Sequence, residues 1–137
     1  MIIIGHKALK SPKFRAIHSI SDIDKTFANE VVFFSDSFEI ARHCNECEIT
    51  YAVEVCRVVD LMIYANLGAK YIVIRRKKLA QICQKLANEY FLDSKILLVV
   101  RDEKGIDSAA NLAMMRDFAF SFARIKRGSF AWDSWVV

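Results

Sequence analysis

Glycine and proline are scarce in this chain, and their scarcity excludes several kinds of ligand site. Only four glycines and one proline occur among 137 residues. The sequence lacks the Gly-x-Gly-x-x-Gly fingerprint of dinucleotide-binding folds and the P-loop that cradles nucleotide phosphates. It also lacks the Gly-x-Ser-x-Gly elbow of α/β-hydrolases and the His-Glu-x-x-His zinc motif. We therefore expect neither a common dinucleotide site nor a P-loop NTPase.

Strong net charge and long apolar stretches are missing as well. The net charge of +4 is small for a dedicated nucleic-acid-binding protein, so weak nucleic-acid binding is only the third hypothesis. The longest apolar stretch, residues 58–74, is interrupted by Asp60 and Lys70 and is too short and too polar to span a membrane. The first seven residues lack the basic-then-apolar order of a signal peptide. We expect a cytoplasmic protein with reduced thiols and no membrane partner.

Apolar residues are abundant, and they form short runs that alternate with helical patterns. Their share of 54% is enough for a buried core in a single domain, residues 1–137. Strand-like runs begin near residues 31, 50, 71, 96 and 118, and helical patterns occupy residues 38–47, 58–67, 77–91 and 106–115. This alternation predicts βαβ units. We expect a three-layer α/β fold with a mainly parallel sheet of about five to six strands, either flavodoxin-like or a half-barrel.

Residues 65–74, Ala-Asn-Leu-Gly-Ala-Lys-Tyr-Ile-Val-Ile, are predicted to join a helix to a strand. This segment resembles the helix-to-strand turn of aldolase-like and other phosphate-handling barrel enzymes, and of flavodoxin-like folds, in which Leu-Gly-Ala leads into a core strand. The resemblance implies an α/β fold and no particular reaction. The chain as a whole resembles a family of proteins from AT-rich epsilonproteobacteria, and that resemblance implies no function.

Four strand-like runs end on arginine, at residues 57, 75–76, 101 and 124. In open α/β sheets the ligand binds beyond the carboxyl ends of the strands. Guanidinium groups bind phosphates and carboxylates bidentately, and helix N-termini at the same edge add N–H donors. We predict a site for a small anionic ligand, such as a phosphate ester or a nucleotide. Its residues would be Ser35, Asp36, Arg57, Arg75, Arg76 and Arg101.

The same arginines also fit a solvated rim, because charged residues often mark the ends of strands. In that interpretation they form ion pairs with Asp60, Asp102 and Glu103. No convincing acid–base pair accompanies them, so the sequence leaves open whether the protein is an enzyme. No cofactor is implied.

Glu54 lies inside a strand-like run, which is an unusual place for a carboxylate. Alternation puts it on the face opposite Tyr51 and Val55. It could act as a general base with a raised pKa. The favoured interpretation is an ion pair with a helix lysine, because a carboxylate in a parallel strand needs a partner.

His43, Cys44 and Cys47 have a spacing that places His43 and Cys47 on one face of a helix. Imidazole and thiolate are ligands that zinc prefers, but a structural site needs four ligands and only Cys56 could supplement these. A redox Cys-x-x-Cys pair normally lies at a helix start, whereas this pair lies toward a helix end. Ordinary helix residues are the favoured interpretation, and we predict no metal site.

Two apolar segments suit a subunit interface. One is the nearly all-apolar helix predicted at residues 58–67. The other is an aromatic tail, which we expect to pack back on the domain or to dock on a second subunit; it contains Phe130, Trp132, Trp135, Val136 and Val137. A non-catalytic homodimeric interaction module is therefore the alternative to an anion-binding protein.

Overall fold

The computed structural model describes residues 2–3, 10, 12–99, 121–123 and 131–132. Its strands are β1 (Ile2–Ile3), β2 (Lys13–Ala16), β3 (Glu30–Ser35), β4 (Tyr51–Glu54), β5 (Tyr71–Ile74), β6 (Lys95–Val99), β7 (Ser121–Ala123) and β8 (Ala131–Trp132). Its helices are the 3-10 helix η1 (Ile20–Lys25), α1 (Phe38–Glu46), α2 (Val58–Asn66) and α3 (Lys77–Glu89). The helix predicted at residues 106–115 lies outside the described residues.

The predicted α/β class and its mainly parallel sheet are confirmed. Five parallel strands, β2 to β6, pair in the order in which they follow along the chain, with α1, α2 and α3 in the last three connections. On the β6 side β7 and then β1 extend the sheet in parallel, whereas β8 pairs with β2 in the antiparallel sense. Two arrangements were expected, a half-barrel and a flavodoxin-like sheet. Neighbouring strands that follow one another along the chain are typical of the half-barrel, because in a flavodoxin-like sheet the order of the strands differs from their order in the sequence.

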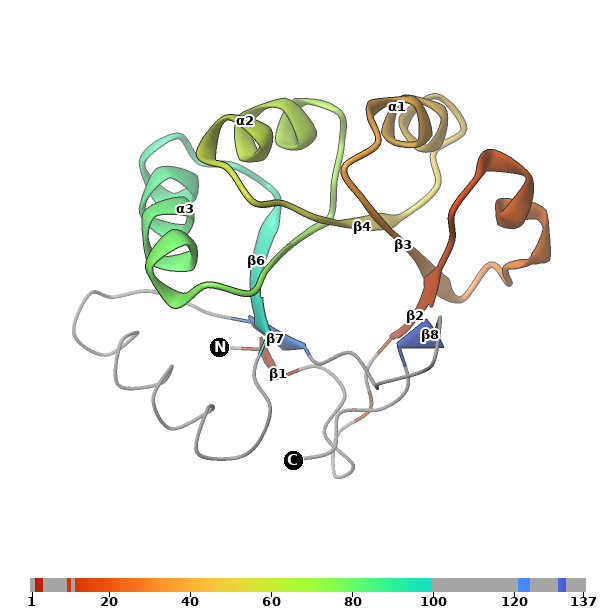
Figure 1. The fold of residues 1–137 in the computed structure, drawn as a ribbon, viewed down its shortest axis with the longest axis horizontal. Coiled ribbons are helices and arrows are strands. Elements are labelled where there is room, and N and C mark those ends of the chain that lie inside the picture. The colour runs from red at the N-terminus through yellow and green to blue at the C-terminus, as the bar shows by residue number, and fades with distance from the viewer. Residues whose placement is uncertain (1, 4–9, 11, 100–120, 124–130, 133–137) are drawn as a thin grey trace.

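The sheet is curved, with α1, α2 and α3 on its convex face (Figure 1). The rings of Phe14 on β2 and Tyr71 on β5 meet edge-on with centroids 5.4 Å apart. Two strands separate β2 from β5, so in a flat sheet these residues would start roughly 14 Å apart. Their contact therefore crosses the concave side.

Small and large side chains alternate across this concave face. Register aligns Ala16, Phe33, Ala52 and Tyr71 in one row over four neighbouring strands. Residues in register share a face, so the small side chain of Ala52 lies between the rings of Phe33 and Tyr71 and leaves room for both. Phe33, Ala52 and Tyr71 are all buried. The concave side of the sheet is thus a packed core rather than an open channel.

The convex face of the sheet is covered by the apolar sides of the helices. On α3 the buried residues follow a helical stripe of Leu79, Ala80, Cys83 and Ala87. The hydroxyl of Tyr51 donates to the backbone carbonyl of Leu67 at 2.8 Å, which ties the end of α2 to the sheet. Among the described residues, no helix is long and apolar enough to cross a membrane.

Gly68 ends α2 with a backbone conformation that other residues rarely adopt. Its φ is +78°, in the left-handed region where a Cβ atom is unfavourable. A Cβ atom at this position would also lie 2.5 Å from Oδ1 of Asn45. The glycine predicted at the end of this helix is therefore required both by its φ angle and by the close approach of Asn45.

Candidate functional site

Ser35, Glu54 and Arg75 come together at the carboxyl edge of the sheet. Ser35 ends β3, Glu54 ends β4, and Arg75 directly follows β5. Ser35 is in register with Glu54, so both side chains lie on the concave face in the row above the packed core. The Nε–H of Arg75 donates to Oε1 of Glu54, and the Ser35 hydroxyl approaches Oε2 at 3.5 Å. These three residues form what we call the rim triad.

Glu54 is the residue that holds the rim triad together. Its side chain is only 17% exposed, whereas that of Arg75 is 50% exposed. A shielded carboxylate needs a charged or hydrogen-bonding partner, and both of the contacts described above supply one. The predicted ion pair between Glu54 and a helix lysine is wrong, since its partner is an arginine at the end of the neighbouring strand. The alternation of the sequence predicted the correct face of the sheet for Glu54, but Glu54 was not among the residues predicted for the anion site.

Asp36 lies beside the rim triad but is fixed by a different residue. It occupies the turn between β3 and α1 with a φ of +35°, a strained value for a residue with a side chain. The hydroxyl of buried Tyr64 donates to its Oδ1 at 3.3 Å. Burial, and then the negative charge of Asp36, raise the pKa of Tyr64 well above its usual range. The Tyr64 hydroxyl therefore stays protonated as a donor to this turn.

Arg57 and Arg76 point their donors at groups of the protein itself. Arg57 binds the buried carboxylate of Asp60 through Nε at 3.2 Å and Nη2 at 3.0 Å. Those hydrogen bonds, and then the charge of Asp60, raise the pKa of Arg57. Arg76 donates from Nη2 to the carbonyl of Cys56 at 2.8 Å. Of the four arginines predicted for the site, Arg101 lies outside the described residues, and only Arg75 joins the rim triad.

The N-terminus of α3 opens at the same edge and is unusually basic. Arg75 and Arg76 precede Lys77 and Lys78, and the first turn carries no acidic residue and no side-chain cap. By contrast, Ser37 caps α1 and Asp60 lies in the first turn of α2. Cations are unfavourable beside the positive end of a helix dipole, whereas an anion there is stabilised. Among the α-helices that the structure describes, α3 therefore has the most electropositive N-terminus.

His43 and Cys47 lie on one face of α1, as the sequence predicts. Sγ of Cys47 is 3.8 Å from Nε2 of His43, while Cys44 is buried in the core. Burial, and then the neighbouring Cys47, raise the pKa of the Cys44 thiol to about 11. The described part of the chain holds no group of three or more potential ligands that could bind a metal ion.

No family model matches this chain, and no curated protein matches its sequence. The case for a function therefore rests on the rim triad and the residues around it.

Proposed function

We propose that the carboxyl edge of the sheet binds a small anionic ligand that carries a phosphate group. Arg75 would make the principal contact, and the N-terminus of α3 would lie against the phosphate. Sheet edges of this kind are where α/β folds bind ligands, both in open sheets and in barrels.

The observation that carries this proposal is how Arg75 is held. Its Nε–H is taken by Glu54, and its terminal Nη groups make no hydrogen bond with any described residue. A guanidinium fixed through one N–H loses less freedom when the remaining donors bind an oxyanion. Its half-exposed position allows a ligand to reach those donors.

Charge at the edge supports the same proposal. Lys77 and Lys78 are exposed in the first turn of α3, and neither forms an ion pair within the described ranges. Together with Arg76, which donates to a backbone carbonyl, they are the excess positive charge at this edge, because Arg57 and Arg75 are each paired with a carboxylate. A phosphate at this position would lower the repulsion between these cations and the helix dipole.

The other predicted site residues take secondary roles in this proposal. The hydroxyl of Ser35 would turn from its long contact with Glu54 to donate to a ligand oxygen, and Asp36 would accept a hydrogen bond from a ligand hydroxyl. Arg76, at the N-cap of α3, would add long-range attraction to the anion. Arg57 would contribute least, since two of its donors already bind Asp60.

Binding can be measured by calorimetry with inorganic phosphate and with simple phosphate esters, using the full chain. We expect Arg75→Ala to weaken binding roughly 10- to 100-fold, the typical effect of losing hydrogen bonds to a charged group. Binding should also weaken with added salt, because the attraction is electrostatic.

Arg15 provides a matched control. Like Arg75 it is partly exposed and faces a carboxylate of the neighbouring strand, with Nη1 3.8 Å from Oε2 of Glu30, but it lies within β2 rather than after the end of a strand. Arg15→Ala should leave phosphate binding unchanged. Equal losses in Arg15→Ala and Arg75→Ala, or no binding of any phosphate compound by the unaltered chain, would contradict the proposal.

A further inference from the structure

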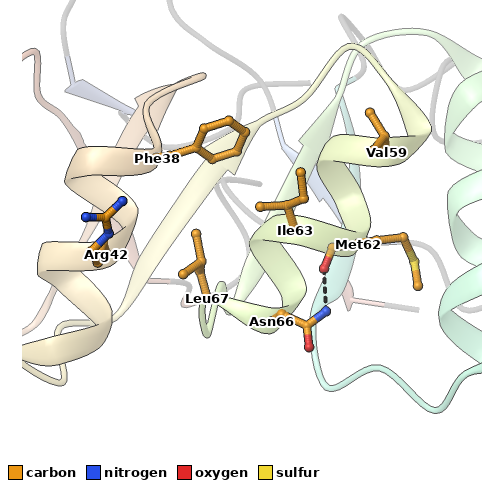
Figure 2. Close-up of a pocket in the computed structure, with 7 residues that line it drawn as sticks. All are labelled: Phe38, Arg42, Val59, Met62, Ile63, Asn66 and Leu67. Carbon is orange, nitrogen blue, oxygen red and sulfur yellow. Dashed lines mark hydrogen bonds between the residues drawn. The ribbon is translucent and has the colours of Figure 1, made fainter.

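A groove lies between α1 and α2 on the convex side of the fold, whereas the side chains of the rim triad lie on the concave face. Its volume is about 560 Å³. Phe38 and Arg42 line it from α1, and Val59, Ile63 and Leu67 line it from the α2 side (Figure 2). Met62 and Asn66 complete the lining, so apart from Arg42 and Asn66 the groove is an apolar surface, with one cation at its border.

The walls of this groove expose apolar side chains to solvent. Val59 is 52% exposed, and Phe38 and Ile63 are each 39% exposed. Val59 and Ile63 are four residues apart, so they form a single ridge along α2. The opposite side of the same helix is buried through Leu61 and Tyr64. Thus α2 is apolar both toward the sheet and toward solvent, a pattern typical of a helix that is buried on two sides.

The charges beside the groove are self-complementary. Glu39, Arg42 and Glu46 are exposed on α1 at spacings of three and four residues, which places them on one stripe. None of the three makes an ion pair with a residue that the structure describes, although their spacing would allow pairs within the helix. An acid–base–acid stripe matches a second copy of itself when the two helices run antiparallel, because each arginine then faces a glutamate.

We propose that this groove binds a second copy of the chain in a symmetric dimer. The Val59–Ile63 ridge of each copy would enter the groove of the other, and Arg42 would pair with Glu39 or Glu46 across the contact. A two-fold interface requires one surface to complement itself, and the ridge, the groove and the charge stripe meet that requirement together. The proposal does not depend on the anion site, which lies at the carboxyl edge of the sheet.

Sedimentation equilibrium of the full chain over a concentration series tests this directly. We expect the mass of two chains at high micromolar concentration. The double variant Val59→Glu/Ile63→Glu should raise the dimer dissociation constant ~100-fold or more, because it places unpaired carboxylates in an apolar contact. Circular dichroism and thermal unfolding of the variant should show that it remains folded, since both positions are exposed.

Ile82→Glu is the matched control, because Ile82 is 50% exposed on the outer side of α3. It should leave the dimer intact. A monomer at every concentration of the unaltered chain would overturn the proposal. So would a dimer that persists in the Val59→Glu/Ile63→Glu variant, or one that is weakened equally by Ile82→Glu.

A charge reversal separates this dimer from nonspecific apolar association. Arg42→Glu should weaken the dimer about tenfold, in line with the loss of a charge pair at an interface. Adding Glu39→Lys and Glu46→Lys to that variant restores an alternating stripe of opposite sign and should restore the dimer. If association is the same in all three proteins, the proposed arrangement of the two copies is wrong.

Discussion

Glu54 of β4 accepts the Nε–H of Arg75 from the end of β5, so two neighbouring strands are joined by an ion pair where their backbone pairing ends. Only the carboxylate of this pair is well shielded from solvent. The pair therefore contributes to stability, but solvent and salt reduce its contribution.

Replacing Glu54 by glutamine should lower the free energy of unfolding by about 1 kcal/mol, because the charged partner of Arg75 is lost while its shape is kept. Urea unfolding measures this. The exposed pair of Lys85 and Glu89 on α3 is the control, with a distance of 3.9 Å. Glu89→Gln should cost less than about 0.5 kcal/mol. Equal costs for both variants would mean that the strand-end pair adds nothing beyond an ordinary surface pair.

Tyr64→Phe removes the hydroxyl that holds Asp36 in the turn after β3. We expect a loss of about 1 kcal/mol in the free energy of unfolding, the typical net contribution of one hydrogen bond, because the exposed Asp36 can bind water instead. Tyr71→Phe is the comparison, since the Tyr71 hydroxyl bonds to no group in the described part of the chain. Chemical denaturation of both variants decides the matter, and a greater loss in Tyr71→Phe would contradict this account of the turn.

The four thiols should fall into two reactivity classes. Cys47 and Cys56 are exposed, whereas Cys44 and Cys83 are buried. A disulfide-exchange reagent should therefore modify the first two rapidly in the native protein. The second two should react only after denaturant is added, because access and a thiolate are both required. Rapid reaction of all four thiols under native conditions would show that the core opens readily.

The buried thiols should also make stability depend on alkaline pH. Burial raises the pKa of both Cys44 and Cys83 to about 11, from an ordinary value of 9.0. The native state thus keeps protons that the unfolded state releases, so the free energy of unfolding should fall between about pH 9 and 11. The variant Cys44→Ala/Cys83→Ala should show a shallower fall over this range than Cys47→Ala/Cys56→Ala. If the free energy of unfolding fell equally with pH in the two double variants, the buried thiols would not be the cause of the fall.

Gly68→Ala should destabilise the protein by about 1–2 kcal/mol, because alanine resists a positive φ and its Cβ atom meets Asn45. Adding Asn45→Ala removes the clash but not the backbone strain. Stability measured by thermal unfolding should therefore recover only in part, relative to Asn45→Ala alone. Full recovery would mean that the φ angle contributes nothing.

Local sequence patterns were enough to predict the alternating order of the elements from β3 to β6. The apolar run Tyr71–Ile74 was predicted as a strand with the bounds that the structure has. The helices at residues 58–67 and 77–91 were each predicted to within two residues of α2 and α3. These predictions succeed because caps, helical stripes and short apolar runs act through neighbours along the chain.

The partners of charged side chains could not be predicted in the same way. Sequence alternation places Glu54 on the correct face, but only the register of β4 against β5 brings Arg75 within reach. Arg57 looks equivalent to Arg75 in the sequence, and its ion pair with Asp60 was expected only as the alternative to an anion site; the structure confirms that pair, in the first turn of the helix that Arg57 precedes. The carboxylate that Arg75 meets depends on strand order and on the distance between two strands, whereas the partner of Arg57 is three residues away along the chain.

The contact between Phe14 and Tyr71 has a consequence for how the chain folds. Each strand and the helix after it can assemble on the preceding unit through contacts that are close in sequence. The two rings, by contrast, are separated by 57 residues (71 − 14) and cannot meet until β2, β3, β4 and β5 are all in place. Contacts between residues so far apart slow folding, because a long loop must close before they form. The contact between Phe14 and Tyr71 thus makes strands β2, β3, β4 and β5 dependent on one another, so that they fold and unfold as one cooperative unit.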